Sequence, residues 1–219
     1  FRAKALTELL RTLEHFNAAI NLRPNFYITR KSTNSDQDQL SLLPEQSRTI
    51  IIAVGARCSG KTTFSDFMAK YETVRVSEAS TVLRGIGEEQ GIVPTSSEEA
   101  LDFLSEVGWD AVARKIADYI DKDDCPLNVV TGLRTPEELL FLKRKFPQSR
   151  IILIDADPRI RFERHILRAR DSSLATMSAF AEEDEKQRKF GTLRIANDIA
   201  EIKIHNDGTL DQYRDKIDE

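Results

Sequence analysis

The segment that most constrains the fold is Gly55-Ala56-Arg57-Cys58-Ser59-Gly60-Lys61-Thr62. It follows the apolar, β-branched run 49–54 and precedes residues 63–70, whose apolar positions have helical spacing. A buried strand, a glycine turn and a helix start bring successive backbone N–H groups and the positive end of a helix dipole onto one small volume. Such a place suits a polyanion, so the sequence predicts a phosphate-binding loop for ATP or GTP.

Each fixed position of this loop has a chemical role. Gly55 and Gly60 permit dihedral angles that side chains forbid, Lys61 reaches β- and γ-phosphate oxygens, and the Thr62 hydroxyl is a ligand for Mg²⁺. The competing interpretation is a glycine-containing turn of an ordinary α/β domain, and the strand and helix around the motif favour phosphate binding. The nucleotide-binding residues predicted here are Gly55, Ala56, Arg57, Cys58, Ser59, Gly60, Lys61, Thr62 and Thr63.

Composition excludes several other classes of protein. The 219 residues are 40% hydrophobic and 31% charged, and the net charge of −4 disfavours nonspecific nucleic-acid binding. Cys58 and Cys125 form no disulfide framework, so we expect an intracellular, cytoplasmic protein. No apolar run approaches the roughly 18 residues that cross a bilayer, and the N-terminus lacks a signal-peptide pattern. The chain starts at Phe1 without a methionine, compatible with one domain excised from a larger protein that has additional domains.

Two parts of the chain are predicted. Residues 1–47 are expected to form an N-terminal amphipathic helix followed by a polar linker, or to be the end of a preceding domain. A helix packed on the core and a helix that binds a partner both remain open for this extension. Residues 48–219 are predicted to form the nucleotide-binding domain.

Strands and helices alternate through this domain. Strands are predicted at 49–54, 73–77, 127–131, 150–154 and around 202–204, and helices at 63–70, 96–104, 109–120, 135–146, from 157 onward, at 177–190 and after Thr209, with 78–87 a helix or loop. Alternation of this kind predicts a three-layer α/β/α fold with a parallel sheet, in which ligands bind beyond the carboxyl ends of the strands. Trp109 is predicted to be a core anchor, the alternative being a side chain that faces the lid.

Arginines follow two of these strands. Arg134 lies at a strand end, where a phosphate ligand and a surface arginine are equally plausible interpretations. The helix from Asp157 is predicted to carry arginines on its exposed side, namely Arg159, Arg161, Arg164, Arg168 and Arg170. A solvated face with salt bridges is the default interpretation of this series, and a mobile lid that closes over phosphates is the sharper hypothesis.

The order of these segments resembles P-loop kinases. The resemblance rests on Gly55 to Thr62, Val74 to Ser77 with Val82-Leu83-Arg84, Gly132 to Glu138, Ile154 to Arg164, Asp184-Glu185, and Asn206 to Leu210. The pattern is most similar to the dephospho-CoA kinase-like and adenylate kinase-like proteins within the nucleoside monophosphate kinase group. It extends from about Thr49 to the C-terminus, and it implies a P-loop NTPase fold.

The resemblance also implies site residues. Lys61 and Thr62 would bind the ATP phosphates and Mg²⁺, and Asn206 to Gly208 would lie near the adenine, with Asn206 and Gly208 as nucleotide-binding residues. Arg84, Arg134 and Arg161 would hold the acceptor, whereas Arg161, Arg164, Arg168 or Arg170 would belong to the lid. Lys61, Arg134, Arg164 and Arg168 would neutralise the charge of the transferred phosphoryl group.

Two positions depart from the pattern. Relatives often have an aspartate before the glycine at the third strand end, where this chain has Thr131, and they often have Gly-Asp where it reads Glu78-Ala79. Loss of either carboxylate would weaken metal binding or acceptor recognition. Asp155 and Glu78 are candidates to compensate.

Three functions are therefore considered. The leading hypothesis is an enzyme that uses ATP and Mg²⁺ to phosphorylate a small acceptor, such as a nucleoside monophosphate or a dephospho-CoA-like molecule. The alternative is a catalytically weak nucleotide-binding regulatory domain of a larger protein, which Thr131 and the absent start methionine motivate. A degenerate scaffold that binds no ATP is a third hypothesis, and the intact Gly60-Lys61-Thr62 argues against it.

Overall fold

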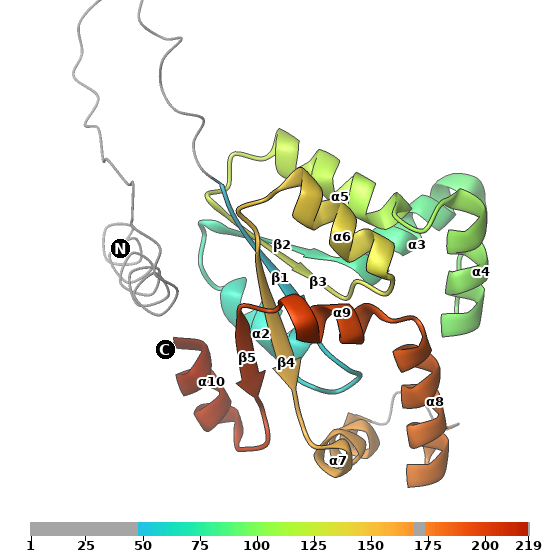
Figure 1. Ribbon diagram of the computed structural model, residues 1–219, viewed down its shortest axis with the longest axis vertical. Helices are drawn as coiled ribbons and strands as arrows, with labels where there is room; N and C mark the ends of the chain where they lie inside the picture. Colours follow the sequence, from blue (N-terminus) through green and yellow to red (C-terminus); the bar gives the residue numbers. More distant parts are fainter. Residues whose placement is uncertain (1–47, 169–173, 219) are drawn as a thin grey trace, which may run out of the picture.

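The computed structural model describes residues 48–168 and 174–218 (Figure 1). The elements are β1 (Thr49–Val54), α2 (Lys61–Met68), β2 (Val74–Glu78), α3 (Ala79–Gln90), α4 (Ser97–Val107), α5 (Ala111–Lys122), β3 (Leu127–Thr131), α6 (Pro136–Lys145), β4 (Arg150–Asp155), α7 (Pro158–Arg168), α8 (Met177–Lys189), α9 (Thr192–Ile199), β5 (Ile202–His205) and α10 (Leu210–Asp218). The predicted extension over residues 1–47 lies outside the described residues. Among those that are described, no helix is long and apolar enough to cross a membrane.

The strands form one parallel sheet. Within the described part of the chain its order is β2-β3-β1-β4-β5, so β1 lies in the centre between β3 and β4. The register pairs Ile51 with Val129 on one side and with Arg150 on the other. Because all these strands are parallel, their carboxyl ends meet at one edge, where the loop after β1 begins.

Alternation along the strands sends apolar side chains to two separate cores. Ile50, Ile52 and Val54 of β1 pack on the face that α3, α4, α5, α6 and α9 cover. Ile51 and Ala53 pack on the opposite face, against α2 and α10 (Figure 1). The period of two is the one that a strand buried on both faces requires. The three-layer α/β/α prediction is therefore confirmed.

Helix caps explain where two of the helices begin. The Thr135 hydroxyl accepts a hydrogen bond from the Glu138 N–H, and the Glu138 carboxylate accepts one from the Thr135 N–H, which together form a capping box at the start of α6. Ser96 caps α4 through the Glu99 N–H. The Glu99 carboxylate instead accepts from the N–H and hydroxyl of Thr95, one residue earlier than a capping box requires.

Two details of the secondary structure and packing differ from the sequence predictions. Helix α9 was not predicted, although Gly191 at its N-cap and the spacing of Leu193, Ala196 and Ile199 are signals that a search for short helices would have found. Trp109 is 42% exposed rather than a core anchor, so that prediction was wrong.

Candidate functional site

The loop between β1 and α2 has the backbone that phosphate binding requires. Cys58 and Gly60 both have positive φ, at 59° and 116°, and the Ser59 N–H donates to the Ala56 carbonyl at 3.2 Å. Helix α2 starts directly after Gly60, whose carbonyl accepts from the Phe64 N–H at 2.9 Å. The first N–H groups of a helix have no partners within it, so those of Lys61, Thr62 and Thr63 are directed toward the space enclosed by the loop.

Both motif glycines are packed too closely for a side chain. A Cβ on Gly55 would lie 2.2 Å from the Ile154 carbonyl oxygen, and one on Gly60 would lie 2.3 Å from Nδ2 of Asn206. Contacts of that length force the neighbouring atoms to move. Gly55 is therefore fixed by the close approach of β4, and Gly60 by the close approach of Asn206 and by its positive φ.

Side chains from the C-terminal region donate hydrogen bonds to backbone carbonyls of the loop. Asn206 Nδ2 donates to the Ser59 carbonyl at 2.8 Å, and the buried Tyr213 hydroxyl donates to the Gly60 carbonyl at 3.2 Å. Arg164 Nη2 donates to Asn206 Oδ1 at 3.2 Å, so α7 is connected to the same network. Asn206 therefore contacts the loop backbone directly, and Arg164 contacts Asn206. Their expected contacts with a nucleotide and with the transferred phosphoryl group stay predictions.

Lys61 folds over the loop. Its Nζ donates to the carbonyl oxygens of Gly55 and Ala56, each at 2.7 Å. Burial lowers the pKa of Lys61 to about 8, the Cys58 sulfur partly opposes this shift, and nearby arginines, among them Arg134, lower the pKa further. Because cations repel this ammonium group, the loop is a site of positive potential, which favours an incoming anion.

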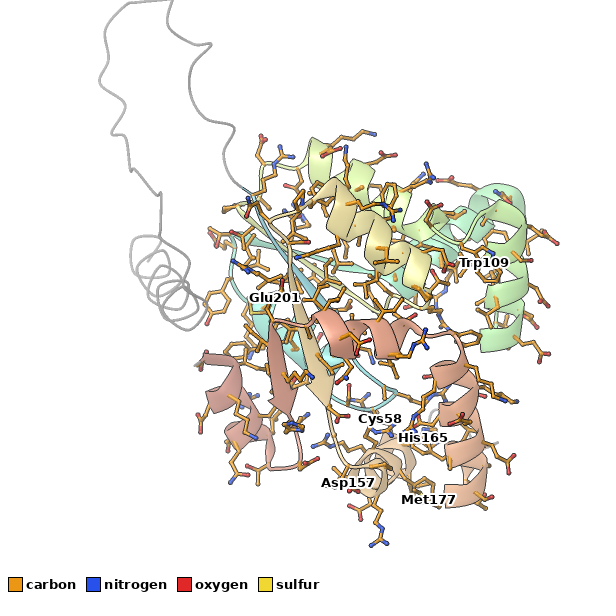
Figure 2. All side chains as sticks on the ribbon, in the orientation of Figure 1. Cys58, Trp109, Asp157, His165, Met177 and Glu201 are labelled. Atoms are coloured by element: carbon orange, nitrogen blue, oxygen red, sulfur yellow. The ribbon has the colours of Figure 1, made fainter. Side chains whose placement is uncertain are left out.

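A cavity of about 370 Å³ lies over the loop. Its lining brings together predicted site residues from separate elements, namely Gly55, Arg57, Cys58, Lys61, Thr62, Arg134 and Arg168. The sequence analysis missed His165, Gln187 and Thr192, which line the same cavity from α7, α8 and α9. Figure 2 shows Cys58 and His165 at the end of the sheet where α7 and α8 lie.

Arg134 is held in place by its own backbone. Its N–H donates to Glu138 Oε2 at 2.6 Å, and its carbonyl accepts from the Thr192 hydroxyl. Burial lowers the pKa of the Arg134 guanidinium from its usual value, with the charge of Arg57 acting in the same direction. The side chain lines this cavity and also a second one. This position favours the interpretation of Arg134 as a phosphate ligand over that of a surface arginine.

The second cavity is larger, about 870 Å³, and shares Arg57, Ser80, Arg134 and Phe190 with the first. Arg84 lines it, and its expected contact with an acceptor stays a prediction. The other charged groups of its lining are Lys186, Lys189, Glu98 and Glu183, and its apolar groups include Leu83, Pro94, Leu101 and Leu174. A ligand bound there would meet both cationic and apolar surfaces, next to the phosphate loop.

The arginines of α7 do not share one exposed face. Arg161 is 2% exposed, and its guanidinium binds both carboxylate oxygens of Asp184 at 2.9 and 2.5 Å. It also donates to the carbonyl oxygens of Ala156 and Arg57. The predicted exposure of Arg161 was wrong, because sequence spacing did not reveal its partner 23 residues later. Its expected contact with an acceptor stays a prediction.

The remaining arginines of this series have different surroundings. Arg164 is partly buried behind the loop, as described above, whereas Arg159 and Arg168 are exposed. Of these three, Arg168 lines the small cavity. Arg170 lies outside the described residues.

The two departures from the kinase pattern have different outcomes. Thr131 is buried at the end of β3 and brings no carboxylate to the cleft. Asp155 is exposed, its Oδ1 accepts from the Ala156 N–H at 2.9 Å, and it is not among the residues that line either cavity. Glu78, at the end of β2, lines the small cavity together with Lys61 and Thr62. Of the two candidates to compensate, Glu78 is therefore the one at the site.

The fold and the phosphate loop define a P-loop kinase-like architecture, and solved structures agree. TT1252 from Thermus thermophilus superposes with a TM-score of 0.52 at 18% identity, covering 78% of this chain and 94% of that one. Shikimate kinase from Acinetobacter baumannii, solved in complex with shikimate, gives a TM-score of 0.52 at 14% identity over 78% of this chain and 88% of its own. At these identities the likeness concerns the fold alone.

Relatives by sequence include UPF0200 proteins. A UPF0200 protein of Thermococcus sibiricus is 29% identical over 178 residues, which cover 77% of this chain and 92% of the relative. A UPF0200 protein of Methanoregula boonei is 26% identical over 171 residues, covering 77% and 93%. No family model matches the chain.

Proposed function

We propose that this chain is a P-loop phosphotransferase that moves the γ-phosphoryl group of ATP to a small phosphorylated or hydroxylated acceptor. The observation that carries the proposal is a pair of adjacent cavities that share four lining residues. One contains the phosphate loop with Lys61 and Thr62, the other contains Arg84, and Arg134 lines both. Donor and acceptor bound in the two cavities would meet beside the lining residues that both cavities share.

The side chains fit the charge changes of phosphoryl transfer. Lys61 Nζ would exchange its bonds to the Gly55 and Ala56 carbonyls for phosphate oxygens. Arg134, fixed through its backbone, would hold the transferred group, and the exposed Arg168 would approach it from the end of α7. Positioning and charge neutralisation of this kind need no covalent intermediate.

Oxygen donors suited to Mg²⁺ line the loop cavity. The Thr62 hydroxyl would hold the ion, and the Glu78 carboxylate, whose Oε1 accepts from the Ser80 hydroxyl at 2.9 Å, lines the same cavity. Mg²⁺ would supply neutralisation of the β- and γ-phosphate charge. Cationic lining in the larger cavity supports an anionic acceptor, such as a nucleoside monophosphate or a dephospho-CoA-like molecule.

The test is transfer of labelled phosphate from ATP to a panel of nucleoside monophosphates and dephospho-CoA. In Lys61→Ala we expect turnover to fall by a factor on the order of 100 or more, because a cation aimed at the phosphates is removed. Lys70→Ala is the matched control, because Lys70 is an exposed lysine just beyond α2 and should leave turnover unchanged. Unchanged turnover in Lys61→Ala would exclude the proposed role of the loop.

Thr131 motivates a second candidate, a nucleotide-binding regulatory domain with little catalysis. The buried threonine brings no carboxylate to a strand end where P-loop kinases often have one. This candidate predicts Mg²⁺-dependent ATP binding without transfer to any member of the acceptor panel. Transfer to any one acceptor excludes it.

A further inference from the structure

Two arginine–carboxylate pairs at neighbouring positions of α8 differ in strength. Asp184 binds Arg161 through two short hydrogen bonds, and the two side chains are 9% and 2% exposed. Glu183 lies 3.6 Å from Arg57, beyond hydrogen-bonding distance, and these side chains are 18% and 27% exposed. The first pair is shielded from solvent and bidentate, whereas the second is longer and partly exposed, so the contact between Glu183 and Arg57 is the one that a ligand can exchange.

The loose pair lies inside the cleft. Arg57 lines both cavities, and Glu183 lines the larger one. Glu183 also lies 4.0 Å from Lys186, another cation of that lining. The charge of Arg57 lowers the pKa of Arg134, and the charge of Glu183 raises it. One carboxylate of α8 is thus surrounded by the cations that an anionic ligand would use.

We propose that Glu183 is a competing anion that sets the affinity of the larger cavity for anionic ligands. Glu183 holds Arg57 until an anionic group of the ligand displaces the Glu183 carboxylate. A phosphate group brings more charge and more acceptor oxygens than a carboxylate, so it gains by the exchange. A ligand carboxylate would replace Glu183 like for like and gain little. The ligand class is therefore a phosphorylated small molecule, and naming it the acceptor rests on the proposed function.

Displacement would also loosen one of the contacts between the loop and α8. The Arg57 carbonyl stays bound to Arg161, and Arg161 stays bound to Asp184, because neither contact involves the Arg57 side chain. The backbone of the loop is therefore held in place while the Arg57 side chain changes partners.

The test is calorimetric titration with inorganic phosphate of the full parent chain, of Glu183→Gln and of the control Glu185→Gln. Glu185 is exposed and lies two positions further along α8. We expect roughly fivefold tighter phosphate binding in Glu183→Gln, the size expected for loss of a partly exposed ion pair, and no change in Glu185→Gln. In an Arg57→Gln background the gain from Glu183→Gln should disappear. Equal or weaker binding in Glu183→Gln, or a gain that persists without Arg57, would overturn the inference.

The phosphate loop also binds phosphate under the proposed function, so each titration is repeated with saturating MgADP. Binding of MgADP with no gain in Glu183→Gln would overturn this inference alone. Absence of MgADP binding would instead count against the proposed function, and the Arg57-dependent gain measured without nucleotide would still support competition by Glu183.

Discussion

The two walls of the cleft are built differently. The phosphate loop is fixed by backbone angles, by close contacts of Gly55 and Gly60, and by neutral donors from Asn206 and Tyr213. In the opposite wall, Arg161 with Asp184 joins α7 to α8. This wall is held to the loop by Arg161, which donates to the Arg57 carbonyl, and by the ion pair of Arg57 with Glu183. We call the phosphate loop the rigid wall and α7 with α8 the charged wall. The rigid wall tolerates little change, whereas the ion pairs of the charged wall can respond to the charge of a ligand.

The largest effect on stability is expected on the charged wall. Arg161→Ala leaves Asp184 buried without its partner, so the free energy of unfolding should fall by about 4 kcal/mol. Arg159→Ala, on the exposed side of α7, should change it by less than about 0.5 kcal/mol. Urea denaturation measures both variants. Equal stability of the two would mean that the pair does not hold this wall.

The next effect tests the rigid wall. Gly60→Ala places a Cβ 2.3 Å from Asn206 Nδ2 at a φ of 116°, which should destabilise the protein by about 3 kcal/mol and abolish ATP binding. Gly85→Ala is the matched control, because a Cβ there meets nothing within 4 Å and Gly85 lies inside α3. That control should be slightly stabilising. Normal ATP binding by Gly60→Ala would show that the loop is more adaptable than we describe.

The pKa of Lys61 predicts how the affinity for ATP depends on pH. The pKa of Lys61 is lowered to about 8, and phosphate oxygens favour the charged amine, so bound nucleotide should raise that pKa again. The affinity for ATP should therefore be highest below pH 8 and fall above it, by up to about tenfold per pH unit. Lys61→Arg, which stays charged, should show a flat profile between pH 7.5 and about 9.5. A flat profile in the parent chain would contradict a lowered pKa.

The smallest expected effect concerns the end of α7. Arg168→Ala should lower the rate of phosphoryl transfer by roughly tenfold while leaving the midpoint of thermal unfolding unchanged, because the side chain is exposed yet lines the loop cavity. Arg159→Ala, exposed on the same helix, should change neither quantity. Steady-state kinetics and a melting curve separate the two outcomes, and a loss of stability in Arg168→Ala would mean that the residue is structural.

The backbone of the phosphate loop could be predicted from sequence, whereas its support by distant side chains and the charged wall could not. Loop residues 55–62 act through local backbone geometry, which a motif between a strand and a helix specifies. The support from Asn206 and Tyr213 comes from about 150 residues away, and no local pattern specifies it. Arg161 shows the same limit, since helical spacing placed it with Arg164 and Arg168 although a carboxylate on α8 buries it. Short helix α9, which supplies Thr192 beside Arg134, was also missed.

The central claim is that the loop between β1 and α2 binds the phosphates of a nucleotide through Lys61. Calorimetric titration with ATP, with and without Mg²⁺, on the parent chain and on Lys61→Ala tests it most directly. We predict Mg²⁺-dependent binding by the parent chain and its loss in the variant, with Lys70→Ala behaving as the parent. Absence of ATP binding by the parent chain, or equal binding by Lys61→Ala, would contradict the claim and would favour a scaffold that keeps the fold without the chemistry.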